Sequence, residues 1–157
     1  MRRILVPTLA LGILIAAGQT QAAGQYPSWQ GQWKIINDTG TEYPASFPKI
    51  ENHVITVSKD DGNKLVYTDR WVIAGKEGSS SFDGAYDGKP YRTSDGHNQS
   101  YEHVAGGYQD HWTDDKGTVG EDHCTFTPDG LHMNCTGSTT PKGGQKLSYK
   151  EHWDKIQ

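Results

Sequence analysis

The chain has 157 residues, with 15 basic and 19 acidic side chains, a net charge of −4 at pH 7, and 33% hydrophobic residues. This length corresponds to one domain with a single modest core. An acidic surface disfavours nucleic acids and anionic membranes, so we expect neither as a partner.

Residues 1–22 are predicted to be a secretory signal peptide. Two arginines precede an apolar run over residues 4–17, and small residues follow as far as Ala22. A membrane anchor is the alternative, but the apolar run is shorter than the roughly 20 residues that a spanning helix needs. We therefore expect a periplasmic or secreted protein without membrane insertion, whose single domain spans residues 23–157.

The rest of the chain is predicted to be all-β. Short runs rich in Val, Ile, Thr, Tyr and Trp alternate with turns, and no stretch has a convincing helical period. Asp-Gly pairs supply the positive φ angles of tight hairpin turns, and they occur at 61–62, 83–84, 87–88, 95–96 and 129–130. We predict strands near 29–36, 48–57, 64–73, 79–86, 89–93, 100–104, 107–114, 119–126, 131–138 and 146–155. Evenly spaced short strands indicate an antiparallel barrel or a sandwich.

Three of these strands repeat the pattern Tyr-x-acid-x-Trp, as YTDRW, YQDHW and YKEHW. Side chains two residues apart share a face of a strand, and apolar neighbours such as Leu65, Ile73 and Leu147 lie on the same face as the repeats. The repeats are therefore predicted to point inward. We name them the three rows: Tyr67, Asp69 and Trp71; Tyr108, Asp110 and Trp112; Tyr149, Glu151 and Trp153.

Inward rows have two alternative roles, and outward rows have a third. Aromatic rings can fill a small barrel, with each carboxylate bonded to a Tyr hydroxyl or a Trp N–H. Rings and carboxylates can instead line a cavity for a cationic or polar aromatic ligand, through cation–π contact and charge pairing. Rows that face solvent would form a patch for a protein or glycan partner. If three carboxylates are buried together, at least one of their pKa values should be raised.

Both cysteines lie in the stretch HCTFTPDGLHMNC, which is either a zinc site or a disulfide-bonded hairpin. A two-residue turn at Asp129 and Gly130 places Cys124 directly opposite Cys135. A three-residue turn with a bulge would shift the register by one residue and put the two cysteines on opposite faces.

The alignment of apolar residues favours the first register. It separates His123 and His132 from the cysteines, so no tetrahedral site can gather all four side chains. We predict a cross-strand disulfide that points into the core and occupies the apolar face with its neighbours Phe126, Pro128, Leu131 and Met133.

Four segments of the mature chain are WQGQW with Gly31 and Trp33, SSSFDGAYDGKPY, TPDGLHMNCTGST and the closing YKEHWDK. Together they resemble a family of small secreted bacterial lipocalin-like proteins. The chain departs from that family in its cysteine pair, its many histidines and its Trp-rich strands. The resemblance implies an antiparallel up-and-down lipocalin-like barrel of 8–10 strands with a ligand cavity, and it supplies no catalytic residues.

No recognised nucleophile, phosphate or metalloprotease motif occurs, so we expect no catalytic residues and no cofactor. We also expect no metal site, because His53, His97 and His103 lack ligand spacing and should lie exposed to solvent.

The favoured function is a periplasmic or secreted non-catalytic binding protein, with a small polar-aromatic or cationic ligand held in the barrel lumen by the three rows. The alternative is a solid-core envelope protein that acts through a protein partner. A hydrolase that uses carboxylates such as Asp69 and Asp110 is a third hypothesis. A lumen below roughly 300 Å³ would remove the case for a drug-sized ligand.

Overall fold

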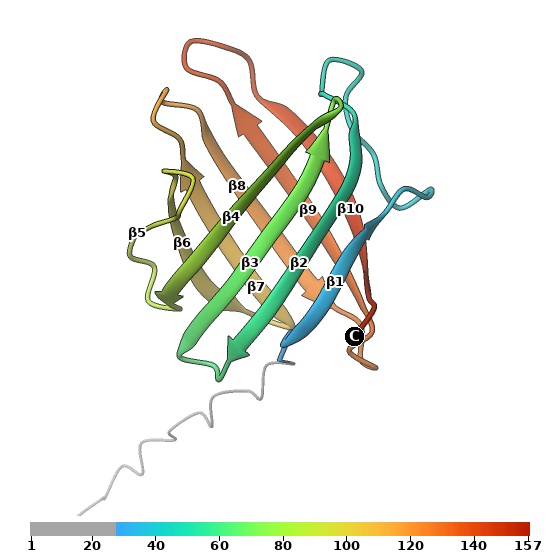
Figure 1. Cartoon of the computed structure of the whole chain (residues 1–157), viewed down its shortest axis with the longest axis vertical. Helices are drawn as coiled ribbons and strands as arrows, with labels where there is room; N and C mark the ends of the chain where they lie inside the picture. The colour runs from blue at the N-terminus through green and yellow to red at the C-terminus, as the bar shows by residue number, and fades with distance from the viewer. Residues whose placement is uncertain (1–27) are drawn as a thin grey trace, which may run out of the picture.

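Residues 28–157, which a computed structural model describes, form ten strands wound into one nearly closed barrel (Figure 1). These residues contain no helix, and so none long and apolar enough to cross a membrane. The predicted signal peptide lies outside the described residues. Each predicted strand has a counterpart: β1 (Gly31–Ile36), β2 (Ile50–Asp60), β3 (Lys64–Ile73), β4 (Lys76–Ala85), β5 (Tyr91–Arg92), β6 (Asn98–Val104), β7 (Gly107–Thr113), β8 (Val119–Phe126), β9 (His132–Thr140) and β10 (Leu147–Lys155).

All of the strands pair antiparallel, in the order β4-β3-β2-β1-β10-β9-β8-β7-β6-β5. The first strand meets the last, with Trp33 opposite Lys155, as an up-and-down barrel requires. The ladder is interrupted between β4 and β5. There, the N–H of Ser94 donates to the carbonyl of Ser81 at 3.1 Å, and the N–H of Ser81 donates to the Ser94 hydroxyl at 2.8 Å. We call this place the seam.

The end of the barrel at which β1 begins is filled by aromatic side chains. Trp29 and Trp33 are fully buried, and the Trp29 ring stacks on Tyr108 with 4.7 Å between centroids. Both indole N–H groups have partners, because Trp29 donates to the Tyr86 hydroxyl at 2.8 Å and Trp33 donates to the Trp29 carbonyl at 2.6 Å. Buried Trp and Tyr need such partners for their polar ends. This end of the barrel is solid.

The disulfide between Cys124 and Cys135 is present and points into the core, as predicted. Its short loop contributes about 2–3 kcal/mol to stability on the chain-entropy estimate. The turn differs from the prediction, since residues 128–131 form a four-residue connection closed by the bond from the Thr127 N–H to the His132 carbonyl. An even number of turn residues preserves the register. Leu131, which was predicted to lie on the apolar face, is instead in the turn and 51% exposed.

The pair Asp83-Gly84 is not a turn, in contrast to the prediction. It lies inside β4, where Gly84 is buried. A Cβ atom at this position would collide with the rings of Phe82 and Tyr91. Glycine is therefore present here for close packing rather than for a positive φ angle, and sequence alone does not separate the two uses.

Candidate binding site in the barrel lumen

All three rows point into the barrel, which confirms the predicted orientation and excludes the solvent-facing alternative. Their nine side chains line one internal cavity, which we call the lumen. The residues between them point outward, as the exposed Arg70, His111 and Lys150 illustrate. Period-two alternation along each strand gives this arrangement, because one face of the sheet is enclosed.

The lumen has a volume of about 290 Å³ and lies between the filled end and the opposite mouth of the barrel. Trp29, Tyr67 and Tyr101 contribute to its wall at the filled end, and Phe47 does so at the mouth. The volume is just below the 300 Å³ that separates drug-sized ligands from smaller ones. A volume at the lower limit of the range for ligand pockets favours a compact small molecule over a drug-sized ligand.

The polar lining of the lumen is strongly acidic. Among the described residues that line it there is neither lysine nor arginine, and the two histidines are His53 and His97. The carboxylates that line it are Asp69, Asp95, Asp110, Asp122 and Glu151.

Glu151 has the partners that a filled barrel would supply. Its Oε1 accepts from the Tyr43 hydroxyl at 2.6 Å, and its Oε2 accepts from the Trp153 indole N–H at 3.0 Å. Tyr43 belongs to the connection between β1 and β2, and its ring stacks on Phe47 with 4.9 Å between centroids. This connection thus reaches over the mouth and closes it in part.

Asp110 is buried and bonded through one oxygen, which accepts from the Gln99 amide at 2.8 Å. Burial raises the pKa of Asp110 to about 7; the Gln99 bond opposes this shift, and the charge of Glu151 adds to it. The expectation that crowded carboxylates would shift a pKa upward is confirmed.

Asp122 is the important residue that the sequence reasoning missed. It lies on β8 directly opposite Asp110 on β7. Burial raises the pKa of Asp122 well above its usual value, and the charges of Asp110 and Glu151 raise it further. Tyr149 and Trp112 hydrogen-bond to Asp122, but its buried Oδ1 has no partner among the described residues. The sequence did contain a signal for this position. The predicted hairpin places Cys124 inward, and Asp122, two residues earlier in the same strand, must then also face inward.

His53 is also in the lumen, contrary to the prediction that it would be exposed. Its Nε2 lies 2.7 Å from Oδ1 of Asp69, and its ring meets Trp153 edge-on with 4.7 Å between centroids. Burial lowers the pKa of His53, but the charge and hydrogen bond of Asp69 outweigh it, so the net shift is upward. The buried Nδ1 has no partner among the described residues. His97 and His103 are likewise half-buried, not exposed.

Glycines on the neighbouring strands allow the aromatic rings of the lumen to lie close to the barrel wall. Trp71 is paired with Gly78, Trp112 with Gly120, and Tyr149 with Gly137. In all three pairs a Cβ atom on the glycine would collide with the ring. The rings lie over bare backbone, which keeps their bulk close to the wall and leaves space in the centre.

No family model matches the chain, and no curated protein is significantly similar to it. The lipocalin-like resemblance therefore stays a prediction, and the interpretation of the lumen rests on its own geometry.

Proposed function

We propose that this barrel is a non-catalytic binding protein that holds a small organic cation in its lumen. The observation that carries the proposal is the acidic lining without lysine or arginine. Aromatic rings beside the carboxylates add cation–π attraction, which is worth about 2 kcal/mol or more at desolvated sites. An anionic ligand would meet repulsion from the same groups.

The buried polar atoms that lack partners support the same proposal. Asp122 Oδ1 is such an atom and lines the lumen, whereas His53 Nδ1 can accept a hydrogen bond only while the ring is neutral. A buried acceptor without a donor costs about 1–3 kcal/mol, and a ligand that supplies the donor or the charge removes that cost. An ammonium group with N–H bonds could serve Asp122, whereas a quaternary ammonium would act through its charge alone.

The proposed compartment is the periplasm or the exterior of the cell. A disulfide persists in oxidising compartments, and Cys124 and Cys135 form one. The predicted signal peptide and the lipocalin-like family are parts of this proposal.

A second candidate is the envelope protein that acts through a protein partner. It is favoured by a groove of about 650 Å³ on the barrel, larger than the lumen and lined by outward side chains that include Glu121, His123, Lys146 and Lys150. Glu151 also has the internal partners that a solid barrel needs. We favour the lumen because Asp110 and Asp122 are desolvated there, whereas the charges of Glu121 and Lys146 pair with each other at 2.8 Å.

Tryptophan fluorescence distinguishes the two candidates, because Trp71, Trp112 and Trp153 line the lumen. We expect choline to change the emission saturably at pH 8, while 3,3-dimethylbutan-1-ol, its uncharged analogue, should have at least tenfold lower affinity. Asp122→Asn should weaken choline binding, and Asp115→Asn, a change at an exposed turn residue, should not. Equal responses to the charged and the neutral compound, or no response to either, would contradict the proposal.

A further inference from the structure

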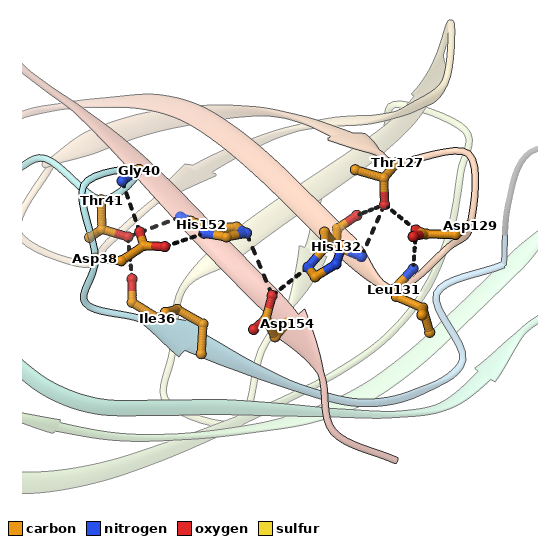
Figure 2. A network of polar contacts seen from close by, with 10 residues as sticks. All are labelled: Ile36, Asp38, Gly40, Thr41, Thr127, Asp129, Leu131, His132, His152 and Asp154. Atoms are coloured by element: carbon orange, nitrogen blue, oxygen red, sulfur yellow. Dashed lines mark hydrogen bonds and ion pairs between the residues drawn. The ribbon is translucent and has the colours of Figure 1, made fainter.

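A second group of chemically reactive side chains lies on the outer face of the barrel, away from the lumen (Figure 2). His132 extends from β9, His152 and Asp154 extend from β10, and Asp38 comes from the connection after β1. One ligand atom from each of His132, His152 and Asp154 lies within 4.8 Å of the other two. None of the three lines the lumen.

The distances among these atoms suit a small metal ion. His132 Nδ1 lies 2.6 Å from Asp154 Oδ1, and His152 Nε2 lies 3.5 Å from the same oxygen. Zinc binds imidazole nitrogen and carboxylate oxygen at about 2.0–2.2 Å, so tetrahedral ligand atoms lie roughly 3.4 Å apart. The distance of 3.5 Å between His152 Nε2 and Asp154 Oδ1 already matches this spacing of ligand atoms. The shorter one is a hydrogen bond that must open by less than about 1 Å, which side-chain rotation can supply.

His152 is oriented by a carboxylate behind it. Its Nδ1 lies 2.8 Å from Asp38 Oδ2, which leaves Nε2 directed at Asp154 (Figure 2). The Asp38 side chain is itself fixed, because its Oδ1 accepts from the Gly40 N–H at 2.8 Å. Thr41 ties this connection to β10 by accepting from the His152 N–H at 3.0 Å. Histidines that bind metals usually have such a partner on the second ring nitrogen, and it fixes the tautomer and orientation.

His132 is held from the other side by the turn between β8 and β9. Its N–H donates to the Thr127 hydroxyl at 3.1 Å, and Asp129 accepts from that hydroxyl at 2.6 Å (Figure 2). His132 is also the cross-strand partner of Asp154. The turn and the ladder together place the two histidines with their ring centroids 5.8 Å apart.

We propose that His132, His152 and Asp154 bind a zinc ion, with Asp38 as the positioning residue behind His152. Two imidazoles and one carboxylate suit zinc and neighbouring transition metals better than calcium or magnesium, which prefer oxygen ligands alone. The side chains of His132, His152 and Asp154 are 43%, 23% and 34% exposed, so the ion can enter from solvent. Three protein ligands leave the fourth tetrahedral position open to water, as in exchangeable rather than purely structural sites. Neither cysteine takes part, because both are in the disulfide.

The test is a calorimetric titration of the tag-free, EDTA-treated protein with zinc chloride alone. We expect one equivalent of zinc to bind and at least a tenfold loss of affinity in the His132→Gln/His152→Gln variant. His123→Gln removes an exposed histidine of the neighbouring strand and should leave the affinity unchanged. Absence of binding, or a loss smaller than tenfold in the double variant, would overturn the site.

Two further measurements keep the test decisive if a variant folds poorly. In the unmodified protein, zinc should shift the histidine ring resonances of His132 and His152 and leave those of His123 in place; the opposite pattern would refute the assignment. Asp38→Asn should lower zinc affinity about tenfold with an unchanged melting temperature in EDTA, and Asp38→Glu should recover part of the loss. Zinc affinity unaffected by Asp38→Asn would remove its positioning role.

Discussion

At the scale of single residues, the environment of each lumen carboxylate decides its protonation. Glu151 accepts from two donors, and Asp69 faces His53. Asp110, in contrast, is buried directly opposite Asp122, whose Oδ1 has no partner among the described residues. Two neighbouring carboxylates in a low-dielectric interior repel each other, and this repulsion favours protonation of at least one of the pair Asp110 and Asp122. The proposed cation site should therefore release a proton from this pair of carboxyl groups when a cation binds.

This protonation makes stability depend on pH in a predictable direction. Burial raises the pKa of Asp110 in the folded protein to about 7, whereas the usual pKa of an aspartic acid is 3.8. The folded state thus binds more protons than the unfolded state between these values, and the free energy of unfolding falls as pH rises through that window. Asp110→Asn removes the titrating group. It should raise the free energy of unfolding by about 1–3 kcal/mol at pH 8 and have little effect at pH 3.

Urea unfolding at the two pH values measures both differences. Asp115→Asn is the matched control, since this exposed turn residue should show no such pH-dependent gain. Destabilisation by Asp110→Asn at pH 8 would mean that Asp110 is held as a satisfied carboxylate, and would contradict the raised pKa.

Sequence reasoning found part of this site and missed part of it. The three rows were predictable because a repeated period-two pattern with apolar neighbours marks the enclosed face of a strand. His53 was missed because a lone histidine beside polar residues is usually exposed, and its burial depends on the long-range contacts with Asp69 and Trp153. The pairing of Asp110 with Asp122 depends on the register between β7 and β8, which no local motif specifies.

At the scale of strands, pairs of one aromatic residue and one glycine shape the lumen. Trp112 lies over Gly120 so closely that a Cβ atom there would meet the ring. Alanine is normally more favourable than glycine in a strand, because glycine loses more backbone freedom on folding. At position 120 the collision with the Trp112 ring makes alanine less favourable than glycine.

We predict that Gly120→Ala lowers the free energy of unfolding by about 1–3 kcal/mol through overpacking. A double-mutant cycle with Trp112→Leu provides the control, because the smaller side chain vacates the space. In that background Gly120→Ala should be neutral or stabilising. An equal loss in both backgrounds would show that the ring does not cause the effect.

The strands themselves were largely predictable, but some turn chemistry was not. β-branched and aromatic runs between Asp-Gly pairs predicted all ten strands, and the even turn set the register of the disulfide. The sequence motif could not distinguish Asp129-Gly130, where glycine has a φ of 69°, from Asp83-Gly84, where glycine makes room for two rings. That difference arises from the packing of Gly84 against Phe82 of the same strand and Tyr91 of the next strand, which the Asp-Gly pair itself does not encode.

At the scale of the whole molecule, the barrel is solid at one end and partly covered at the other. Trp29 and Trp33 fill the end at which the chain enters, and Tyr43 and Phe47 reach over the mouth. At the seam, β4 and β5 are not joined by a continuous ladder of hydrogen bonds, so the barrel wall is most weakly connected there. The space left between the two ends is acidic and measures about 290 Å³, which is the basis of the proposed cation site.

The most direct measurement is calorimetry of choline binding at pH 7 in two buffers with different ionisation enthalpies. A cation in the lumen favours ionised carboxylates, so binding should release protons from the coupled pair Asp110 and Asp122. We expect roughly one proton released per choline bound, and an affinity that increases as pH rises through 7. Binding without proton release, or no binding at any pH at which the protein is folded, would contradict the proposal of a cation site in the lumen.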